Sequence, residues 1–458
     1  MDLQPSEQVN IPATFSTPFL YAGTVFFGVP EFVDCADAGE TLLGPCRDLS
    51  VCVTSSTTNR DVVDKRLDGS NYIEGDAVDS SDLVRWFVDG ICNVVALDNL
   101  YLNETMVREF GYEGPYKASS VLHSKDPLSF MTRGMDVQFG DFVDWVLRAL
   151  ITAEAWNITK ETANQFPTTT VFGAKYENMF VDAIAAVGNY GELFARNLEE
   201  YLPRAGVNGL NFKEDTGLVY SFPFGNTKLP VDILPENLVP RPAIGGTLEA
   251  IESRGSLRCG VVGERPGLAQ NNGTDISEEW IGLNAEYCRG LCNVLFATQG
   301  AEHMAFVEFS SVEEAFEGLA NGDVDLFAGA PFTLQNDVKE ATTGLGFAFS
   351  PTYFYEEGHA YALATREEDI QWSDFVRWIT MATFHAEEEN ITANHASEMP
   401  VVDLFGPSYR QALRDVVLSI GNYGQMYDRS MEPVVARAGR NLLNEGGTPQ
   451  MAATAGFE

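Results

Sequence analysis

The chain has 458 residues, 45% of them hydrophobic, which is enough for two or three domains with buried cores. Its 66 acidic and 29 basic residues give a formal net charge of −37, which repels nucleic-acid phosphates and anionic membrane surfaces. No apolar run approaches the roughly 20 residues of a membrane-spanning helix. We therefore expect no nucleic-acid partner and no membrane insertion, and the even spread of acidic residues favours a solvated surface over a cation site.

The first folded region is predicted at 19–134, after an N-terminal segment at 1–18. The runs LSVCVTSS (49–56) and NVVALDNLYL (93–102) are rich in β-branched and aliphatic residues and predict strands, with helical residues between them. Strands that alternate with helices of this length predict a parallel sheet covered by helices.

A helical stretch then occurs twice in the chain without a gap. Trp145 aligns with Trp378 and Gly188 with Gly421, at one constant offset in residue number. Apolar residues at spacings of three and four predict helices with the tryptophans in their cores, so the closing segments 135–224 and 367–445 are expected to share one fold. The matched sequences are FGDFVDWVLRALITAEAWNIT (139–159) with WSDFVRWITMATFHAEEENIT (372–392), and AVGNYGELFARN (186–197) with SIGNYGQMYDRS (419–430).

A Pro-rich linker at 225–246 separates the two halves, and a second α/β domain is predicted at 247–366. LRCGVV (257–262) and VDLFAG (324–329) predict strands, and helical patterns lie between them. Residues 446–458 are expected to form a flexible tail. The fold class predicted is α/β, with two lobes of twisted, mainly parallel sheet flanked by helices and two repeated helical segments.

The sequence contains no motif for a metal or cofactor site. None of the seven cysteines forms part of a zinc-binding pattern, and G-x-S-x-G, P-loop and dinucleotide fingerprints are missing, so we expect neither an enzyme nor a bound cofactor. Four N-x-S/T sequons suit an exported protein made by a glycosylating cell. The candidate glycosylation sites are Asn103, Asn157, Asn272 and Asn390.

Several segments together resemble the periplasmic substrate-binding proteins of ABC transporters, in the type II branch that binds general and polar amino acids. The resemblance lies in LEAIESRGSLRCGV (248–261), GLNAEYCRGL (282–291), FEGLANGDVDLFAG (316–329), VCVTSSTT (51–58), VVALDN (94–99) and the twice-present GNYG. It implies that 247–349 is the starting half of lobe one, that 24–134 is lobe two, and that both helical stretches close lobe one. Such an order fits a permuted, partly duplicated molecule or a window from a tandem array.

The cysteines fit the two lobes that the resemblance implies. Cys52 and Cys92 fall on two lobe-two strands, Cys259 and Cys288 fall on a strand and helix of lobe one, and each pair can form a disulfide. Cys35 and Cys46 would close a short loop and leave Cys292 unpaired. A buried free thiol is the alternative for each of them, because sequence alone does not fix connectivity.

The resemblance implies a solute-binding module with its ligand between the lobes. Ser55, Ser56 and Thr57 would present donors to a carboxylate, and Asp98 would accept from an ammonium group; a strand-end turn is the alternative for Asp98. Thr333 would assist from lobe one. Such a protein would be extracellular or periplasmic, and its partners would be a membrane transporter or further copies of itself.

Departures from the family favour a second hypothesis, a degenerate binding fold used as a structural or adhesive repeat. Asn336 stands where the family has a carboxylate-clamping Arg, Asn284 replaces an Asp, and Ser56 replaces a Gly. The lost guanidinium removes a bidentate charged contact. We therefore expect weak or no binding of ordinary amino acids, and a neutral or cationic ligand if there is one.

Overall fold

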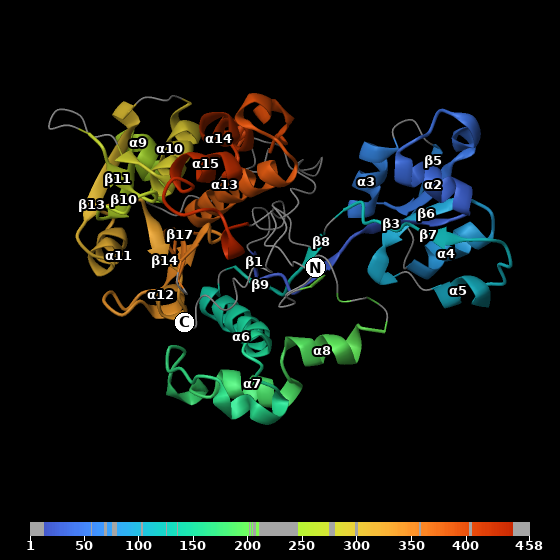
Figure 1. Ribbon diagram of the computed structural model, residues 1–458, viewed down its shortest axis with the longest axis horizontal. Helices are drawn as coiled ribbons and strands as arrows, with labels where there is room; N and C mark the ends of the chain where they lie inside the picture. Colours follow the sequence, from blue (N-terminus) through green and yellow to red (C-terminus); the bar gives the residue numbers. More distant parts are fainter. Residues whose placement is uncertain are drawn as a thin grey trace. The chain divides into compact units, whose positions relative to one another are not determined.

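The structure is a computed structural model in which two compact units are distinguished, and each is considered by itself. The described residues of Pro18–Leu128 form unit 1, and those of Gln4–Thr17 and Ser129–Glu458 form unit 2. Figure 1 draws unit 1 in blue and cyan. The residues that the structure describes are 13–55, 57–67, 71–75, 80–101, 104–124, 126–134, 136–200, 202, 204, 208–209, 246–273, 280–297, 301–356, 359–402 and 405–442.

Unit 1 is built on a five-stranded sheet in the order β5-β4-β6-β3-β7. Strand β4 runs parallel to β5 and β6, whereas β3 runs antiparallel to β6 and β7. The sheet is therefore mixed, not mainly parallel, because β3 begins at the edge where β6 ends, with Thr24 opposite Asp98. The strands are β3 (Thr24–Gly28), β4 (Ser50–Thr54), β5 (Asn71–Gly75), β6 (Val94–Asp98) and β7 (Lys117–Ala118), and a separate antiparallel pair is β2 (Leu20–Ala22) with β8 (Asp126–Leu128).

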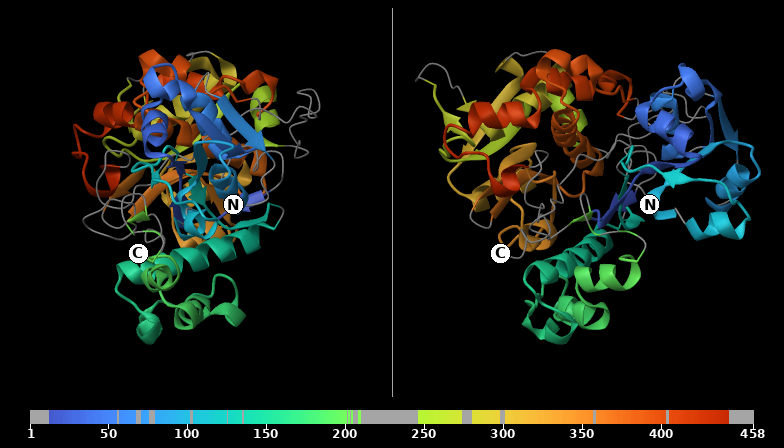
Figure 2. Two further views of the ribbon diagram at one scale, coloured as in Figure 1. Left: turned by 90° about the vertical axis from the view of Figure 1, so that its right-hand side faces the viewer. Right: turned by 45° about the vertical axis from the view of Figure 1, so that its right-hand side comes forward.

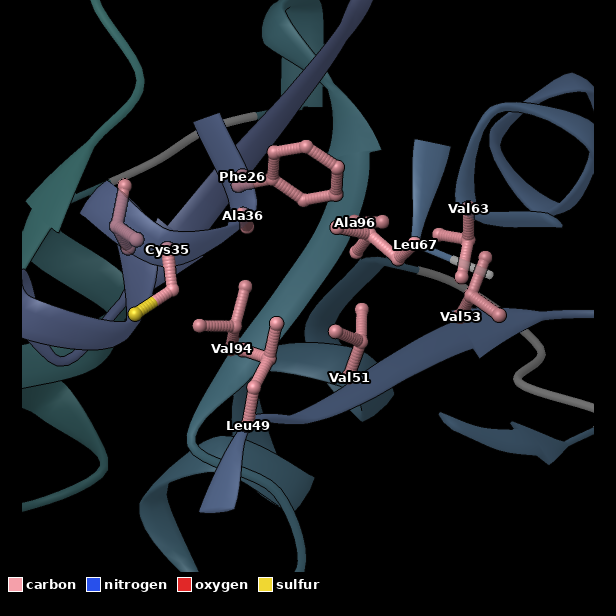
Figure 3. Packing of buried hydrophobic residues seen from close by; sticks show 11 residues of the cluster. Phe26, Cys35, Ala36, Leu49, Val51, Val53, Val63, Leu67, Val94 and Ala96 are labelled. Atoms are coloured by element: carbon pink, nitrogen blue, oxygen red, sulfur yellow. The ribbon is translucent and has the colours of Figure 1, made fainter. Parts of the chain in front are cut away.

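Helices cover both faces of this sheet, because successive strand residues point to opposite sides. Phe26, Val51 and Val53 pack in the cluster of Figure 3, with Val33 of α2 and Val63 of α3. Strand residues that point to the other face, among them Cys52, pack instead against α4 and the residues that follow it. The helices are α2 (Pro30–Ala38), α3 (Thr58–Arg66), α4 (Ser80–Val88) and α5 (Glu104–Glu109), with short turns η1 (Gly44–Asp48) and η2 (Asn99–Tyr101).

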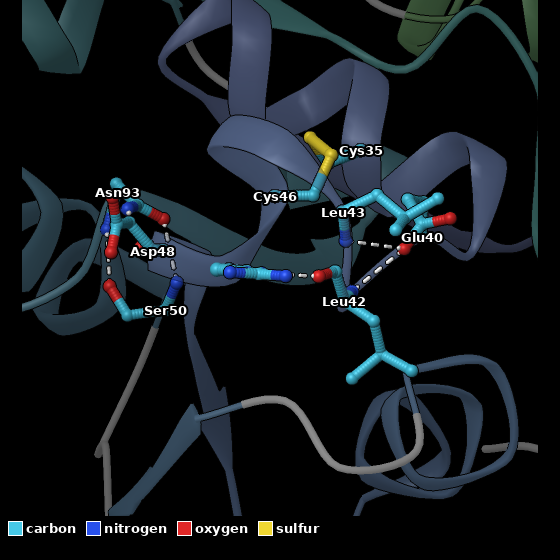
Figure 4. The surroundings of a disulfide bond; sticks show 9 residues. Cys35, Glu40, Leu42, Leu43, Cys46, Asp48, Ser50 and Asn93 are labelled. Carbon is cyan, nitrogen blue, oxygen red and sulfur yellow. Dashed lines mark hydrogen bonds between the residues drawn. A yellow bond between two sulfur atoms is a disulfide. The ribbon is translucent and has the colours of Figure 1, made fainter.

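Among the described residues three disulfides form, and they join the pairs expected in the sequence. In unit 1 the Cα atoms of Cys52 and Cys92 are 5.8 Å apart and those of Cys35 and Cys46 are 5.5 Å apart. Figure 4 shows the second of these beside a turn in which the Glu40 carboxylate accepts from two backbone N–H groups. In unit 2 Cys259 is bonded to Cys288 across 6.2 Å between Cα atoms, and Cys292 is a buried free thiol.

Unit 2 contains a six-stranded sheet in the order β13-β10-β14-β17-β15, with β16 also pairing with β17. Strand β10 is parallel to β13 and β14, and β17 is antiparallel to its three partners, so this sheet is mixed as well. The strands are β10 (Leu257–Val262), β13 (Met304–Phe309), β14 (Leu326–Pro331), β15 (Phe347–Phe349), β16 (Phe354–Glu356) and β17 (His359–Arg366), and small antiparallel pairs are β1 (Ala13–Phe15) with β9 (Met131–Arg133) and β11 (Gln270–Asn271) with β12 (Trp280–Ile281).

Helices accompany the strands of this sheet, and α10 packs against the helices that follow β17 (Figure 2). Helix α10 carries the Cys288 half of the unit 2 disulfide on its sheet-facing side. The helices are α9 (Thr247–Arg254), α10 (Leu283–Phe296), α11 (Val312–Asn321) and α12 (Leu334–Lys339), with a short turn η7 (Ala301–His303).

The two matched helical stretches have the same elements at the same positions, as the sequence predicted. Each helix of the second stretch begins and ends at a constant distance in residue number after its counterpart in the first, the same distance that separates Trp145 from Trp378. Trp145 and Trp378 are both fully buried, which confirms their predicted core positions. The first stretch consists of α6 (Val137–Ala155), η3 (Lys160–Gln165), η4 (Ala174–Tyr176), α7 (Met179–Val187) and α8 (Tyr190–Asn197), and the second of α13 (Ile370–Glu388), η8 (Ala393–Glu398), η9 (Pro407–Tyr409), α14 (Ala412–Ile420) and α15 (Tyr423–Ser430), followed by η10 (Gly439–Leu442).

Among the described residues, no helix is both long enough and apolar enough to span a membrane.

We predict that removing the Cys52–Cys92 disulfide lowers the free energy of unfolding of unit 1 by about 2–4 kcal/mol, because the cross-link limits the unfolded chain. The double variant Cys52→Ala/Cys92→Ala is compared with the native chain in urea, with far-UV circular dichroism as readout. The variant Cys292→Ala is the control, since this thiol lies in unit 2. An unchanged transition for unit 1 in the double variant would contradict the prediction.

Candidate functional site

The candidate site of unit 1 lies at one edge of its sheet, where β4 and β6 both end. The two strands are parallel neighbours with Val51 opposite Val94 and Cys52 opposite Val95. Continuing this register places Ser55 level with Asp98. Helix α3 begins directly after β4 with Thr57 as its N-cap, so the N–H groups of its first turn belong to the same edge. The topology therefore brings the expected donors and the expected acceptor together within one unit.

Two hydroxyl groups at this edge donate hydrogen bonds to the backbone. The Thr57 hydroxyl donates to the Thr54 carbonyl at 2.8 Å, and the Ser55 hydroxyl donates to the Gly75 carbonyl at 3.3 Å. Asp98 is half-buried at the end of β6. Ser56 lies outside the described residues. Both hydroxyls therefore hold the loop in place, and the Thr57 oxygen keeps lone pairs that can accept a further hydrogen bond.

A hydrogen-bond chain beside Asp98 was not foreseen from the sequence. The buried Thr24 hydroxyl, opposite Asp98 in the sheet, donates to Asn59 Oδ1 at 2.7 Å and lies 2.9 Å from the Ser124 hydroxyl. Ser124 in turn donates to the buried Asp126 carboxylate at 2.8 Å. These residues come from separate segments of the chain, so no local spacing indicates them; only Asn59, within the VTSSTTN run, stood near a residue already singled out.

In unit 2 the expected ligand groups Thr333 and Asn336 serve the local fold. Thr333 is the N-cap of α12 and its hydroxyl accepts from the Asn336 backbone N–H at 3.0 Å. The Asn336 side-chain amide donates to the Pro331 carbonyl at 2.9 Å. An arginine side chain would extend beyond this carbonyl, whereas the shorter asparagine satisfies it. The substitution at position 336 thus replaces a charged extension by a locally bonded amide.

The first helical stretch packs directly on this part of unit 2. Trp145 of α6 donates from Nε1 to the Asp337 carboxylate at 2.6 Å, and its ring stacks on Phe332 at 5.5 Å between centroids. Arg148 lies over the Phe332 ring at 4.9 Å and pairs with Asp144 at 2.6 Å. The turn between β14 and α12 is therefore held by α6 as well as by its own strand.

Three carboxyl groups meet where α6, α12 and the end of β17 approach one another. Burial raises the pKa of Asp141, and the nearby charges of Asp337 and Glu367 raise it further. Burial also raises the pKa of Asp337, against the effect of its hydrogen bond from Trp145, and burial raises the pKa of Glu367. Asp374, the counterpart of Asp141 in the second stretch, has its pKa raised to about 7 by burial although Arg377 acts against the shift.

Asn284, which replaces an acid of the resembled family, is buried in a satisfied network. Its amide donates to the Ala328 carbonyl at 3.3 Å, and its carbonyl oxygen accepts from the Tyr353 hydroxyl at 2.8 Å. That hydroxyl accepts from the Gly329 N–H at 2.8 Å. Gly329 has φ +80, and a Cβ there would lie 2.3 Å from the Asn284 amide nitrogen. The site needs a side chain that both donates and accepts, which an ionised aspartate cannot do.

Three of the four sequon asparagines lie among the described residues, and all three are exposed: Asn157, Asn272 and Asn390. Asn157 and Asn390 directly follow the C-caps of α6 and α13 with φ of 58° and 57°. Asparagine adopts this left-handed conformation more readily than most residues, so the helix ends by themselves explain both. Glycosylation stays a prediction for all four, and Asn103 lies outside the described residues.

Comparison with known proteins finds similarity to binding proteins over part of the chain. No protein-family model matches it. A glutamate/glutamine/aspartate/asparagine-binding protein of Rhodobacter capsulatus is 28% identical over 198 residues, which cover 38% of this chain and 57% of that protein. A putative amino-acid ABC transporter-binding protein of Escherichia coli is 26% identical over 113 residues, 24% of this chain and 30% of the relative. The chain is related to the binding proteins of amino-acid ABC transporters.

This relationship confirms the family recognised in the sequence motifs, and it extends over part of each protein. The chain spans 57% and 30% of the length of these two binding proteins. Among solved structures, a periplasmic binding protein of an ABC transporter from Brucella ovis with glutathione bound is 20% identical, with 45% of this chain and 70% of that chain covered and a TM-score of 0.35.

We predict that Asn284→Asp lowers the free energy of unfolding of unit 2 by about 1–3 kcal/mol, although the resembled binding proteins carry an acid there, because the carboxylate would face the Ala328 carbonyl without a proton to donate. Thermal unfolding at neutral pH measures the change. Asn321→Asp, at the exposed end of α11, adds the same charge without burial and is expected to have a smaller effect, because only the helix dipole opposes it there. Equal effects of the two substitutions would refute this account of the network.

We predict that unit 2 loses thermal stability as the pH rises from about 5 to about 8. The folded-state pKa values of Asp141, Asp337 and Glu367 lie above their ordinary values of 3.8 and 4.5, so their neutral forms stabilise the fold at acid pH and deprotonation removes that contribution. Asp141→Asn is expected to flatten the pH dependence of the melting temperature, and Asp182→Asn on the exposed face of α7 is not. A melting temperature that rises over this range in both proteins would show the sign to be wrong.

Proposed function

We propose that the chain is a solute-binding module whose main ligand contacts come from the sheet edge of unit 1. The proposal rests on the parallel register of β4 and β6, which puts Ser55 level with Asp98 beside the first turn of α3. The N–H groups of the first α3 turn suit a carboxylate or carbonyl oxygen, and Asp98 suits an ammonium group. The relationship to amino-acid-binding proteins and the three disulfides, which suit an oxidising extracellular or periplasmic space, support this proposal.

The preferred ligand is a small neutral or cationic solute. Asn336 stands at the position of the family's Arg and donates to the Pro331 carbonyl, so unit 2 lacks the guanidinium that would replace the water around an anionic group. A net charge of −37 adds to the cost of an anion. The Rhodobacter capsulatus relative is described as binding glutamate and aspartate among others, and we propose that this chain does not share that preference.

The alternative is a binding fold retained as a structural or adhesive repeat. It is favoured by one observation in unit 2, where the β14–α12 turn is capped by Thr333 and packed against Trp145 through Phe332. A turn so fully used by the fold has little freedom to receive a solute. Under this alternative the chain binds no small molecule, and its surfaces carry its function.

Calorimetric titration of the full chain with lysine, arginine, putrescine, glutamine, glutamate and a neutral sugar distinguishes these proposals. We predict binding of an amine that weakens at least about tenfold in Asp98→Asn, since a charge-assisted contact is lost. Asp89→Asn, an exposed residue just after α4, makes the same charge change and is expected to leave the dissociation constant unchanged. Tighter binding of glutamate than of lysine would refute the proposed ligand class. The absence of binding to every compound would favour the structural repeat.

A further inference from the structure

The two matched helical stretches have different surroundings within unit 2. In the second stretch, Ile420 and Val416 of α14 lie against Gly290 of α10, where a Cβ would come within 2.6 Å and 3.1 Å of their side chains. Tyr409 donates its hydroxyl to Glu252 of α9 at 2.6 Å. The second stretch is therefore covered by the segment Thr247–Pro331, which contains both of these helices.

The same positions of the first stretch are uncovered. Val187, Tyr176 and Phe139 have exposed fractions of 38%, 41% and 53%. Their counterparts in the second stretch are buried, with exposed fractions of 3% for Ile420, 7% for Tyr409 and 0% for Trp372. Since the helices themselves are the same, the difference lies in the absence of a covering segment over the first stretch among the described residues.

Polar groups on the two stretches show the same contrast. In the second stretch Arg429 donates to the backbone carbonyls of Gln425 and Ile420 and pairs with Glu286 of α10 at 3.0 Å. Arg196 makes the equivalent two backbone contacts, to Glu192 and Val187. Within the described part of the chain it has no carboxylate partner, although it is already held in the orientation that its counterpart uses.

The charged residues just before the first helix of each stretch show the same contrast between a covered and an uncovered position. Arg366 donates to the Leu319 carbonyl at 3.0 Å and to the Thr247 hydroxyl at 2.5 Å, and Asp369 accepts from the Thr247 N–H at 2.6 Å. Their counterparts Arg133 and Asp136 have side-chain exposures of 88% and 48% and lie 3.9 Å from each other. The buried anchor of the second stretch is thus an exposed ion pair in the first.

We propose that the face of the first stretch formed by Arg133, Phe139, Tyr176, Val187 and Arg196 is a docking surface for a second polypeptide segment of the Thr247–Pro331 kind. The contacts of the second stretch specify this partner: a helix with a glycine to receive Val187, a carboxylate for Arg196, another for Tyr176, and a helix N-terminus for Asp136. The proposal does not depend on any solute.

A second copy of this chain does not satisfy the surface. Each copy carries one covering segment and two helical stretches, and its covering segment is already occupied by α13–α15. Exchange between copies would leave as many uncovered stretches as before and would bury no additional apolar surface. The partner is therefore a segment of this kind that has no closing stretch of its own.

Thiol alkylation of the full chain under native conditions tests whether the face is open. Val187→Cys is expected to react at a rate like that of Leu418→Cys, a control on the outer side of α14 that is 62% exposed. Ile420→Cys, the buried counterpart, is expected to react at least about a hundredfold more slowly. If Val187→Cys is as protected as Ile420→Cys, the chain already covers this face and the proposal is wrong.

A fused chain tests the partner, with an additional copy of residues 246–366 joined before residue 1 through a flexible Gly/Ser linker. The added segment is expected to protect Val187→Cys at least about tenfold and to leave Leu418→Cys reactive. Arg196→Glu in the same fusion is expected to restore reactivity, because it repels the Glu286 carboxylate of the added segment. The added segment is expected to fold by docking on this face. Unchanged reactivity of Val187→Cys would therefore overturn the proposal, whether the added segment folds elsewhere or stays unfolded.

Discussion

The organisation of unit 2 depends on one polar junction, where the end of β17 meets the start of α9. Arg366 donates to one carbonyl in the last turn of α11, to one just before β14 and to the Thr247 hydroxyl, and Asp369 accepts from the first N–H of α9. Because these groups are largely removed from water, breaking one contact leaves a buried charge or N–H unpaired, which costs more than the hydrogen bond itself contributes. The junction therefore fixes where the sheet ends and the closing helices begin.

Each closing stretch also carries its own internal restraints, which explains how one helical fold survives in two settings. Asn189 donates to the Ile158 carbonyl at 2.8 Å and Asn422 to the Ile391 carbonyl at 2.9 Å, and each asparagine also forms a capping box with the residue three positions on. Arg204 and Arg437 make matching bidentate pairs with Glu154 and Glu387. Packing by other segments decides how exposed these helices are, whereas hydrogen bonds and ion pairs within each stretch decide how the helices are arranged.

The polar groups that the sequence proposed for a ligand are used differently in the two units, each considered by itself. At the unit 1 edge, Asp98 at the end of β6 and the first turn of α3 belong to the same edge of the sheet. In unit 2 the corresponding polar groups are committed to the Thr333 cap and the Pro331 carbonyl. This difference is the physical reason for proposing a ligand with a cationic or neutral group instead of an anionic one.

The sequence by itself determined the α/β class, the resemblance to amino-acid-binding proteins and the shared path of the two helical stretches. These follow from patterns within one segment or from a gap-free match at a constant offset, as at Trp145 and Trp378. Only the tertiary structure decided the antiparallel placement of β17 and β3, the hydrogen-bond chain from Asn59 to Asp126, and the cover over Ile420 but not Val187. Those features join segments that lie far apart in the chain, and the identity of a side chain does not reveal which distant surface will exclude water from it.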